Sequence, residues 1–134
     1  SPTAFREIAL PALRALADAH RALAGSGLHL VLGGDVVPVL DELVSLRPAL
    51  LICPPETERT VFMESLRAHP EIAVRINIPP VVFTPAGEER AIAEATIALS
   101  LAAGREKVSI GTGVLPYDAD PEIVLKIKGG KGIR

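Results

Sequence analysis

The sequence predicts an α/β protein built from consecutive parallel βα units. Four short apolar runs lie at 28–32, 49–53, 73–78 and 107–110, and each is followed by turn residues and then by helical spacing. Near-continuous apolar strands that alternate with helices are typical of a parallel sheet with right-handed crossovers. A doubly wound sandwich and half of a barrel share this pattern, and periodicity alone leaves both open.

The first helix is expected to begin at Ser1-Pro2, where a capping hydroxyl precedes a proline in the first turn. Pro11 should kink or split this helix because proline donates no backbone hydrogen bond. Gly25-Ser26-Gly27 should end it. The apolar positions with helical spacing, which we expect to face the core, are Phe5, Ile8, Ala9, Ala12, Leu13 and Leu16.

Glycine and proline turns predict where the strands of the next two βα units end. The strand at 28–32 should stop at Gly33-Gly34-Asp35, and Asp35 can cap a helix over 36–46. The strand at 49–53 should stop at Pro54-Pro55, with Glu56 or Thr57 starting the helix that His69-Pro70 ends.

The last two units follow the same rule. In the strand at 73–78, Arg75 and Asn77 alternate with apolar residues, and 81–83 is compatible with a bulged continuation. The clearest helix covers 87–103, and the strand at 107–110 breaks at Gly111-Thr112-Gly113. The expected apolar stripe of the 87–103 helix is Ile92, Ala95, Leu99 and Ala102. A short helix over 122–128 completes one domain, 1–128, before an expected flexible tail at 129–134.

Composition narrows the class of protein. Hydrophobic residues make up 49% of the chain and aromatic residues only 3%, so the core must be aliphatic. The net charge of −2, with both signs interspersed, gives no basic face for nucleic acid, and the basic tail that includes Lys126 and Lys128 is expected to be solvated. No apolar run approaches the roughly 18 residues of a membrane span. The single cysteine, Cys53, allows no intrachain disulfide, and we predict a cytoplasmic protein.

Candidate functional residues lie where the strands end, because the carboxyl ends of parallel strands carry the sites of such folds. Asp35 is more typical of a helix cap than of a base, whereas Asn77 at a strand end is less common. His29 is expected in the core or facing a helix, and Cys53 is expected to be a small buried residue. The glycine turns at 33–35 and 111–113 are too short for a phosphate-loop fingerprint.

Several segments, in order, resemble the uroporphyrinogen decarboxylase superfamily, which includes corrinoid-linked methyltransferases. They are Ser1-Pro2-Thr3-Ala4-Phe5-Arg6-Glu7 with Leu10-Pro11, the turn at 32–40, Arg75-Ile76-Asn77-Ile78-Pro79-Pro80, and the segment 110–116 followed by Asp120-Pro121-Glu122. The resemblance implies strands five to eight of a (β/α)8 TIM barrel, that is, its C-terminal half. It implies cofactor-independent decarboxylation of a tetrapyrrole or similar polycarboxylate by the complete barrel.

The resemblance also suggests which residues line the mouth of the barrel and bind substrate: Gly34, Asp35, Asn77, Thr112 and Gly113. The catalytic residues stay unassigned. Departures from the family pattern are informative. Val31, Gly33 and Val114 occupy the positions of the zinc ligands of the methyltransferase branch, so we expect no metal. Thr112 stands where the decarboxylase branch has a histidine.

Two alternatives remain open at this stage: a methyltransferase of the corrinoid-linked branch without its zinc site, and a non-catalytic half-barrel that needs a partner. A half-barrel has open sheet edges, so we expect a homodimer or association with an N-terminal half-barrel. Its other partner is a small-molecule substrate, with no nucleic acid and no membrane. We predict that the isolated chain is inactive.

Overall fold

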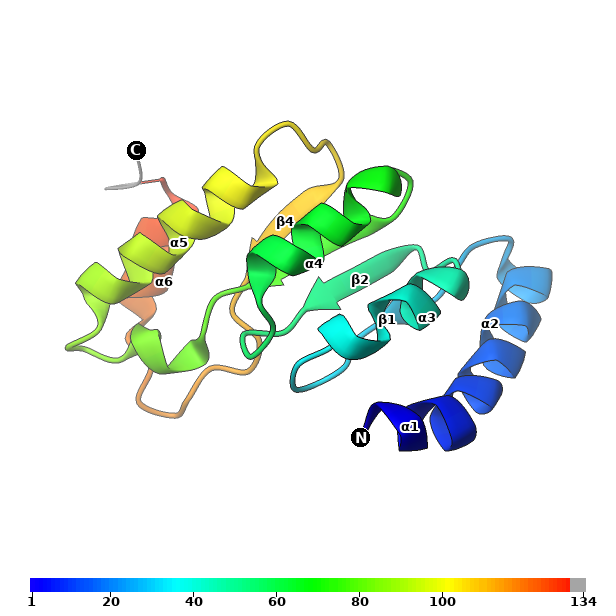
Figure 1. Cartoon of the computed structure of the whole chain (residues 1–134). Coiled ribbons are helices and arrows are strands. Elements are labelled where there is room, and N and C mark those ends of the chain that lie inside the picture. Colours follow the sequence, from blue (N-terminus) through cyan, green and yellow to red (C-terminus); the bar gives the residue numbers. More distant parts are fainter. Residues whose placement is uncertain (131–134) are drawn as a thin grey trace.

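The computed structural model describes residues 1–130 and has one parallel sheet (Figure 1). Its strands are β1 (His29–Leu30), β2 (Leu50–Cys53), β3 (Ala73–Asn77) and β4 (Val108–Gly111), and they pair in the order β1-β2-β3-β4. Helices lie between consecutive strands, so the predicted α/β class with parallel βα units is confirmed. The strand order never reverses within the described sheet, as it would at the switch point of a doubly wound sandwich.

The helices between the strands cover one face of the sheet. They are α3 (Leu40–Ser45), α4 (Arg59–Ser65) and α5 (Glu88–Ala102), which Figure 1 shows side by side in front of the strands. Right-handed crossovers between strands that follow one another in space put every connecting helix on the same side. The opposite face carries no helix that connects two of these strands.

The N-terminal helix is divided in the way that Pro11 predicts. It consists of α1 (Pro2–Ala4), the π-helical turn η1 (Phe5–Ala9) and α2 (Leu10–Ala24). Pro11 has no N–H to donate four residues back, and the π turn ends at Ala9, two residues before it. Ser1 caps the start by accepting from the Ala4 N–H, and Gly25 ends α2 with φ of 69°.

The predicted core face of this helix is partly wrong. Phe5 and Leu13 pack on the core as predicted, together with Leu10 and Ala17, whereas Ile8 and Leu16 are 74% and 56% exposed. A π turn holds about one residue more than an α turn, so residues before it are rotated by roughly 100° relative to those after it. That rotation brings Phe5 onto the core face and leaves Ile8 outside.

Three other sequence expectations change in the structure. The helix after β1 is split into a 3-10 turn, η2 (Val37–Val39), and α3. Glu58 caps α4 by accepting from the N–H groups of Thr60 and Val61, so neither Glu56 nor Thr57 starts that helix. The segment after Pro79 is a 3-10 helix, η4 (Pro80–Phe83), and not a bulged strand, because two consecutive prolines remove the N–H groups a ladder needs.

The long helix α5 buries alanines and not its larger residues. Its buried positions are Ala91, Ala95 and Ala98, whereas Leu99, expected in the apolar stripe, is 45% exposed. Ala95 is buried as predicted, and Ala98, three residues further along the helix, is buried in place of Leu99.

The core forms two clusters. One lies under α2, α3 and α4 and includes Leu51, Phe62 and Ile76; the other joins η4 and α5 to α6 (Pro121–Lys128) and includes Phe83 and Ile123. A third 3-10 turn, η3 (Leu66–Ala68), extends α4. Of the predicted tail, Gly129 and Gly130 form the turn that closes α6, and 131–134 lie outside the described residues. Within the described chain, no helix has the length and apolar character to cross a membrane.

Candidate functional site

The face of the sheet that the helices leave free carries the polar residues of β3. Leu51, Cys53, Val74 and Ile76 belong to the core under the helices. Side chains alternate along a strand, so Ile52, Arg75 and Asn77 point the other way. The register sets Arg75 abreast of Ile52 and Ser109, and Asn77 abreast of Gly111. This open face is therefore polar on β3 and β4.

Arg75 lies over the glycine of the neighbouring strand. A Cβ at position 111 would overlap the Nε, Cζ and Nη2 atoms of Arg75, so the guanidinium fills the place where residue 111 would carry its side chain. The Nε atom is buried and, within residues 1–130, has no hydrogen-bond partner. Arg59 and Arg105 also have a buried N–H without a partner, but both are bonded through another nitrogen. Arg75 differs because no ion pair or side-chain hydrogen bond anchors it within residues 1–130, whereas buried polar groups are normally satisfied.

Asn77 stands beside this guanidinium. Its side chain is 8% exposed, and its Oδ1 is buried without a partner in the part of the chain that the structure describes. Gly113, with φ of 67°, passes close by, so that a Cβ there would lie 3.7 Å from the Asn77 Nδ2. Thr112 donates to the Gly113 carbonyl at 3.1 Å. The structure thus brings together three of the five predicted mouth residues: Asn77, Thr112 and Gly113.

The other two predicted residues, Gly34 and Asp35, form hydrogen bonds that stabilise the loop after β1. Asp35 is exposed and accepts from the Val37 N–H at 3.1 Å, a local turn bond. The predicted cap is wrong, because Val36 and Val39 precede η2 and α3 and neither helix has a side-chain cap. The Gly34 carbonyl accepts from the Thr57 hydroxyl at 3.0 Å, and Thr57 in turn accepts from the Val36 N–H. Since β2 lies between β1 and β3, these contacts are about two strand spacings, roughly 10 Å, from Asn77.

Two further residues can now be placed. The expectation that His29 lies in the core or faces a helix is wrong. His29 is exposed, because it alternates with the buried Leu30 and therefore lies on the open face at the edge of the sheet. Cys53 is fully buried, as expected, and burial raises the pKa of its thiol from 9.0 to about 12. A protonated, buried thiol is a poor nucleophile.

The raised pKa of Cys53 predicts how stability varies with pH. Above pH 9 the thiol of the unfolded chain ionises while the folded one stays protonated, so the unfolded state binds fewer protons. The free energy of unfolding should therefore decline as the pH rises from 9 towards 12. Urea titrations at several pH values should show this decline, and Cys53→Ala should make it shallower. An unchanged slope in Cys53→Ala would contradict this assignment.

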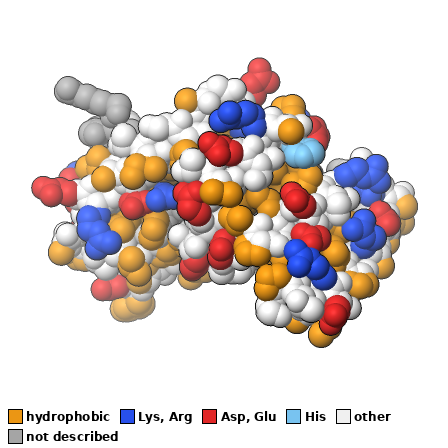
Figure 2. Space-filling view, viewed as in Figure 1, with side chains coloured by type: hydrophobic (Ala, Val, Ile, Leu, Met, Phe, Trp, Pro, Cys, Tyr) orange, Lys and Arg blue, Asp and Glu red, His pale blue; other side chains and the backbone are white. Residues whose placement is uncertain are grey.

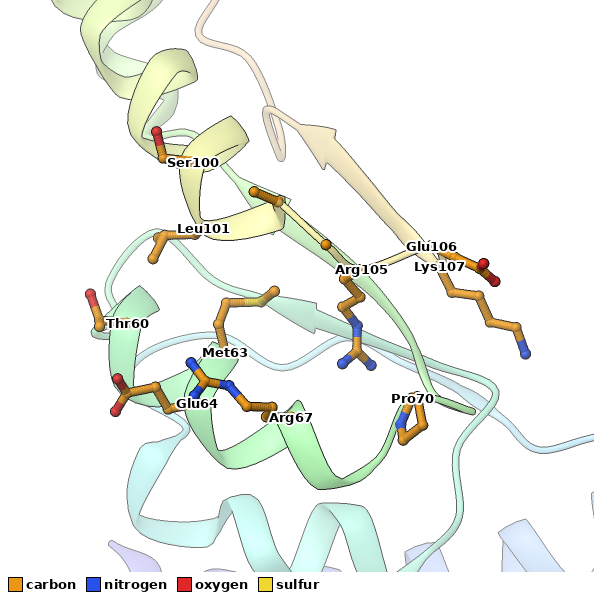
Figure 3. A pocket seen from close by; sticks show the side chains of 12 residues that line it. Thr60, Met63, Glu64, Arg67, Pro70, Ser100, Leu101, Arg105, Glu106 and Lys107 are labelled. Atoms are coloured by element: carbon orange, nitrogen blue, oxygen red, sulfur yellow. The ribbon is translucent and has the colours of Figure 1, made fainter.

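A cavity of about 640 Å³ lies at the opposite end of the strands (Figure 3). It opens between α4 and α5, and its wall includes Pro70 just before β3 and Lys107 just before β4. In this wall the guanidinium of Arg105 donates hydrogen bonds to the carbonyls of Leu66, His69 and Ile72. These bonds satisfy the end of η3, so Arg105 has a structural role at the amino ends of the strands, where stability and not catalysis is typical.

A second cavity of about 430 Å³ is lined by residues of β3 and β4 and of the helices η4, α5 and α6. Arg75, Gly111 and Thr112 contribute to its wall, and the rest is mostly apolar, with Ile110 and Leu99 among the lining residues. Pockets of this volume with few polar groups are typical of small-molecule sites. Arg75 is therefore accessible from a cavity at the carboxyl end of the sheet.

The helix-covered surface carries charges of both signs. Figure 2 shows acidic and basic side chains interspersed over the helix-covered side. Among residues 1–130, no group of three or more His, Cys, Asp or Glu side chains is placed to hold a metal ion. Comparison with known proteins adds nothing to these observations, since no protein family, curated protein or solved structure matches the chain.

Proposed function

We propose that the chain is the C-terminal half of a (β/α)8 barrel of the uroporphyrinogen decarboxylase type, with β1–β4 as strands five to eight. Three features of the described residues support this: the sequential strand order, the helices on one face, and polar side chains on the face that would become the barrel interior. The resembling segments occur in the order that this assignment requires.

The proposed activity of the complete barrel is cofactor-independent decarboxylation of a tetrapyrrole or a similar polycarboxylate. The observation that carries it is at the carboxyl end of β3, where the buried Arg75 Nε and Asn77 Oδ1 atoms have no hydrogen-bond partner among residues 1–130. A buried polar atom without a partner costs free energy, and a ligand that pairs with it recovers that cost. A guanidinium suits a carboxylate because its donors match the two oxygens.

The missing strands would come from an N-terminal half and not from a second copy. A helix already lies at each end of the described sheet, since α2 precedes β1 and α6 follows β4. In a barrel closed from two copies, α6 of one copy and α2 of the other would occupy the same position at each junction. An N-terminal unit of four strands and three helices begins and ends with a strand, so it would add no helix at either junction. Ile8, Leu16 and Leu23 are exposed on the N-terminal helix, and a neighbouring helix of that unit would cover them.

The reading frame tests this assignment. Upstream of the Ser1 codon, we expect an open frame of on the order of 100 or more codons with four strand patterns and three helix patterns. An in-frame stop codon directly upstream would contradict it.

Since half of the site lies in that unit, the isolated chain should not turn over uroporphyrinogen, and measurable turnover would contradict the proposal.

Replacing Asn77 with leucine should weaken ligand binding without lowering the stability of the fold. Leucine has a similar shape and removes the unpaired Oδ1, so stability should stay level or rise by about 1 kcal/mol. Uroporphyrin, a stable polycarboxylate, should bind the variant roughly five- to tenfold more weakly, measured by its fluorescence. Ser109→Ala, on the same face but exposed, is the control. Wild-type affinity in Asn77→Leu would argue against the site.

A further inference from the structure

The Arg75 guanidinium and the Asn77 amide lie at the same height along the strands on the open face, although the two residues are two positions apart in sequence. Gly111 is the register partner of Asn77, and adjacent strands lie about 4.8 Å apart. Because the Arg75 guanidinium occupies the side-chain place of Gly111, it stands directly beside the Asn77 amide. A ligand group of a few atoms can therefore reach both side chains.

The unpaired atoms differ in kind. Arg75 Nε is a donor on a cation, and Asn77 Oδ1 is an acceptor. Both are buried, and no hydrogen bond joins them to each other or to any other group described. A ligand that satisfies both must offer an acceptor to Arg75, for which an anionic oxygen forms the stronger bond, and an N–H or O–H donor to Asn77.

We propose that Arg75 and Asn77 form a subsite for a carboxylate that carries an N–H or O–H donor on the neighbouring atom. This inference rests on the proposed function, because it takes the open face as the ligand face. It adds a specificity: a carboxylate alone leaves Asn77 Oδ1 unpaired, and a neutral amide with the same donor offers Arg75 only an uncharged, weaker acceptor. The apolar cavity beside Arg75, Gly111 and Thr112 favours a ligand with an apolar body.

Three matched probes test the subsite by calorimetry on the chain. Indole-2-carboxylate has both the carboxylate and the adjacent N–H; benzofuran-2-carboxylate lacks the N–H, and indole-2-carboxamide lacks the charge. Indole-2-carboxylate should bind roughly tenfold more tightly than either. Asn77→Leu should remove the preference over benzofuran-2-carboxylate only. Arg75→Gln should remove the preference over the carboxamide only, and Ser109→Ala should keep both.

Equal affinity for the three probes, no binding of any of them, or preferences that survive both substitutions would overturn the inference. The proposed function would fail separately. If uroporphyrin still binds with the dependence on Asn77 expected above, the open face remains the ligand face and only the proposed specificity is lost. If uroporphyrin binding is also indifferent to Asn77, both fail.

Discussion

Phe62→Ala is expected to lower the free energy of unfolding by about 3–5 kcal/mol. Phe62 lies on α4, has no exposed surface and packs in the larger core cluster. A chain with only three phenylalanines and no tryptophan has few other large side chains to fill the space. Since domains are typically stable by about 5–15 kcal/mol, this loss should leave the variant marginal at best.

Urea denaturation followed by circular dichroism measures this loss, and Val61→Ala is the matched control. Val61 precedes Phe62 on the same helix but is 41% exposed, so its truncation should cost under about 1 kcal/mol. Similar losses for the two variants would contradict the assigned packing of α4 against the sheet.

Gly111→Ala is expected to abolish most ligand binding while leaving the fold intact. The new methyl group would occupy the place of the Arg75 guanidinium, which must move because a side chain yields more easily than the backbone. Gly111 does not have a positive φ, so alanine is tolerated in the strand and should change stability by no more than about 1 kcal/mol. Uroporphyrin should bind at least roughly tenfold more weakly.

Gly33→Ala provides the control for a glycine at the end of another strand. A Cβ there meets nothing within 4 Å, and its φ is not positive. Its uroporphyrin affinity should equal that of the unsubstituted chain. Unchanged affinity in Gly111→Ala, with the fold retained, would show that the placement of Arg75 over Gly111 has no part in binding.

The sequence predicted the fold class because each strand has its own stop signal. Proline and glycine turns bracket the apolar runs, and all four predicted strands are present, the first reduced to His29–Leu30. The helix faces were harder to predict. Periodicity assumes unbroken α geometry, so it failed where the π turn shifts the register before Leu10 and where α5 buries Ala98 in place of Leu99.

The candidate site was only partly predictable, because it depends on how β3 and β4 align with each other. Strand alternation puts Arg75 and Asn77 on one face, and the sequence pointed to Asn77 as an unusual strand-end residue. The role of Arg75 was missed because it depends on the register between β3 and β4, which sets Gly111 beside Asn77 and makes room for the guanidinium. No pattern in a single sequence specifies that register.

Mapping uroporphyrin on the chain by amide chemical shifts tests most directly whether the open face at the carboxyl ends of the strands binds ligand. The proposal predicts shifts at Asn77, Gly111 and Gly113, with none at Gly104 or Arg105 beside the larger cavity. Shifts confined to Gly104, Arg105 and their neighbours would place the ligand at the amino ends of the strands and contradict the proposal.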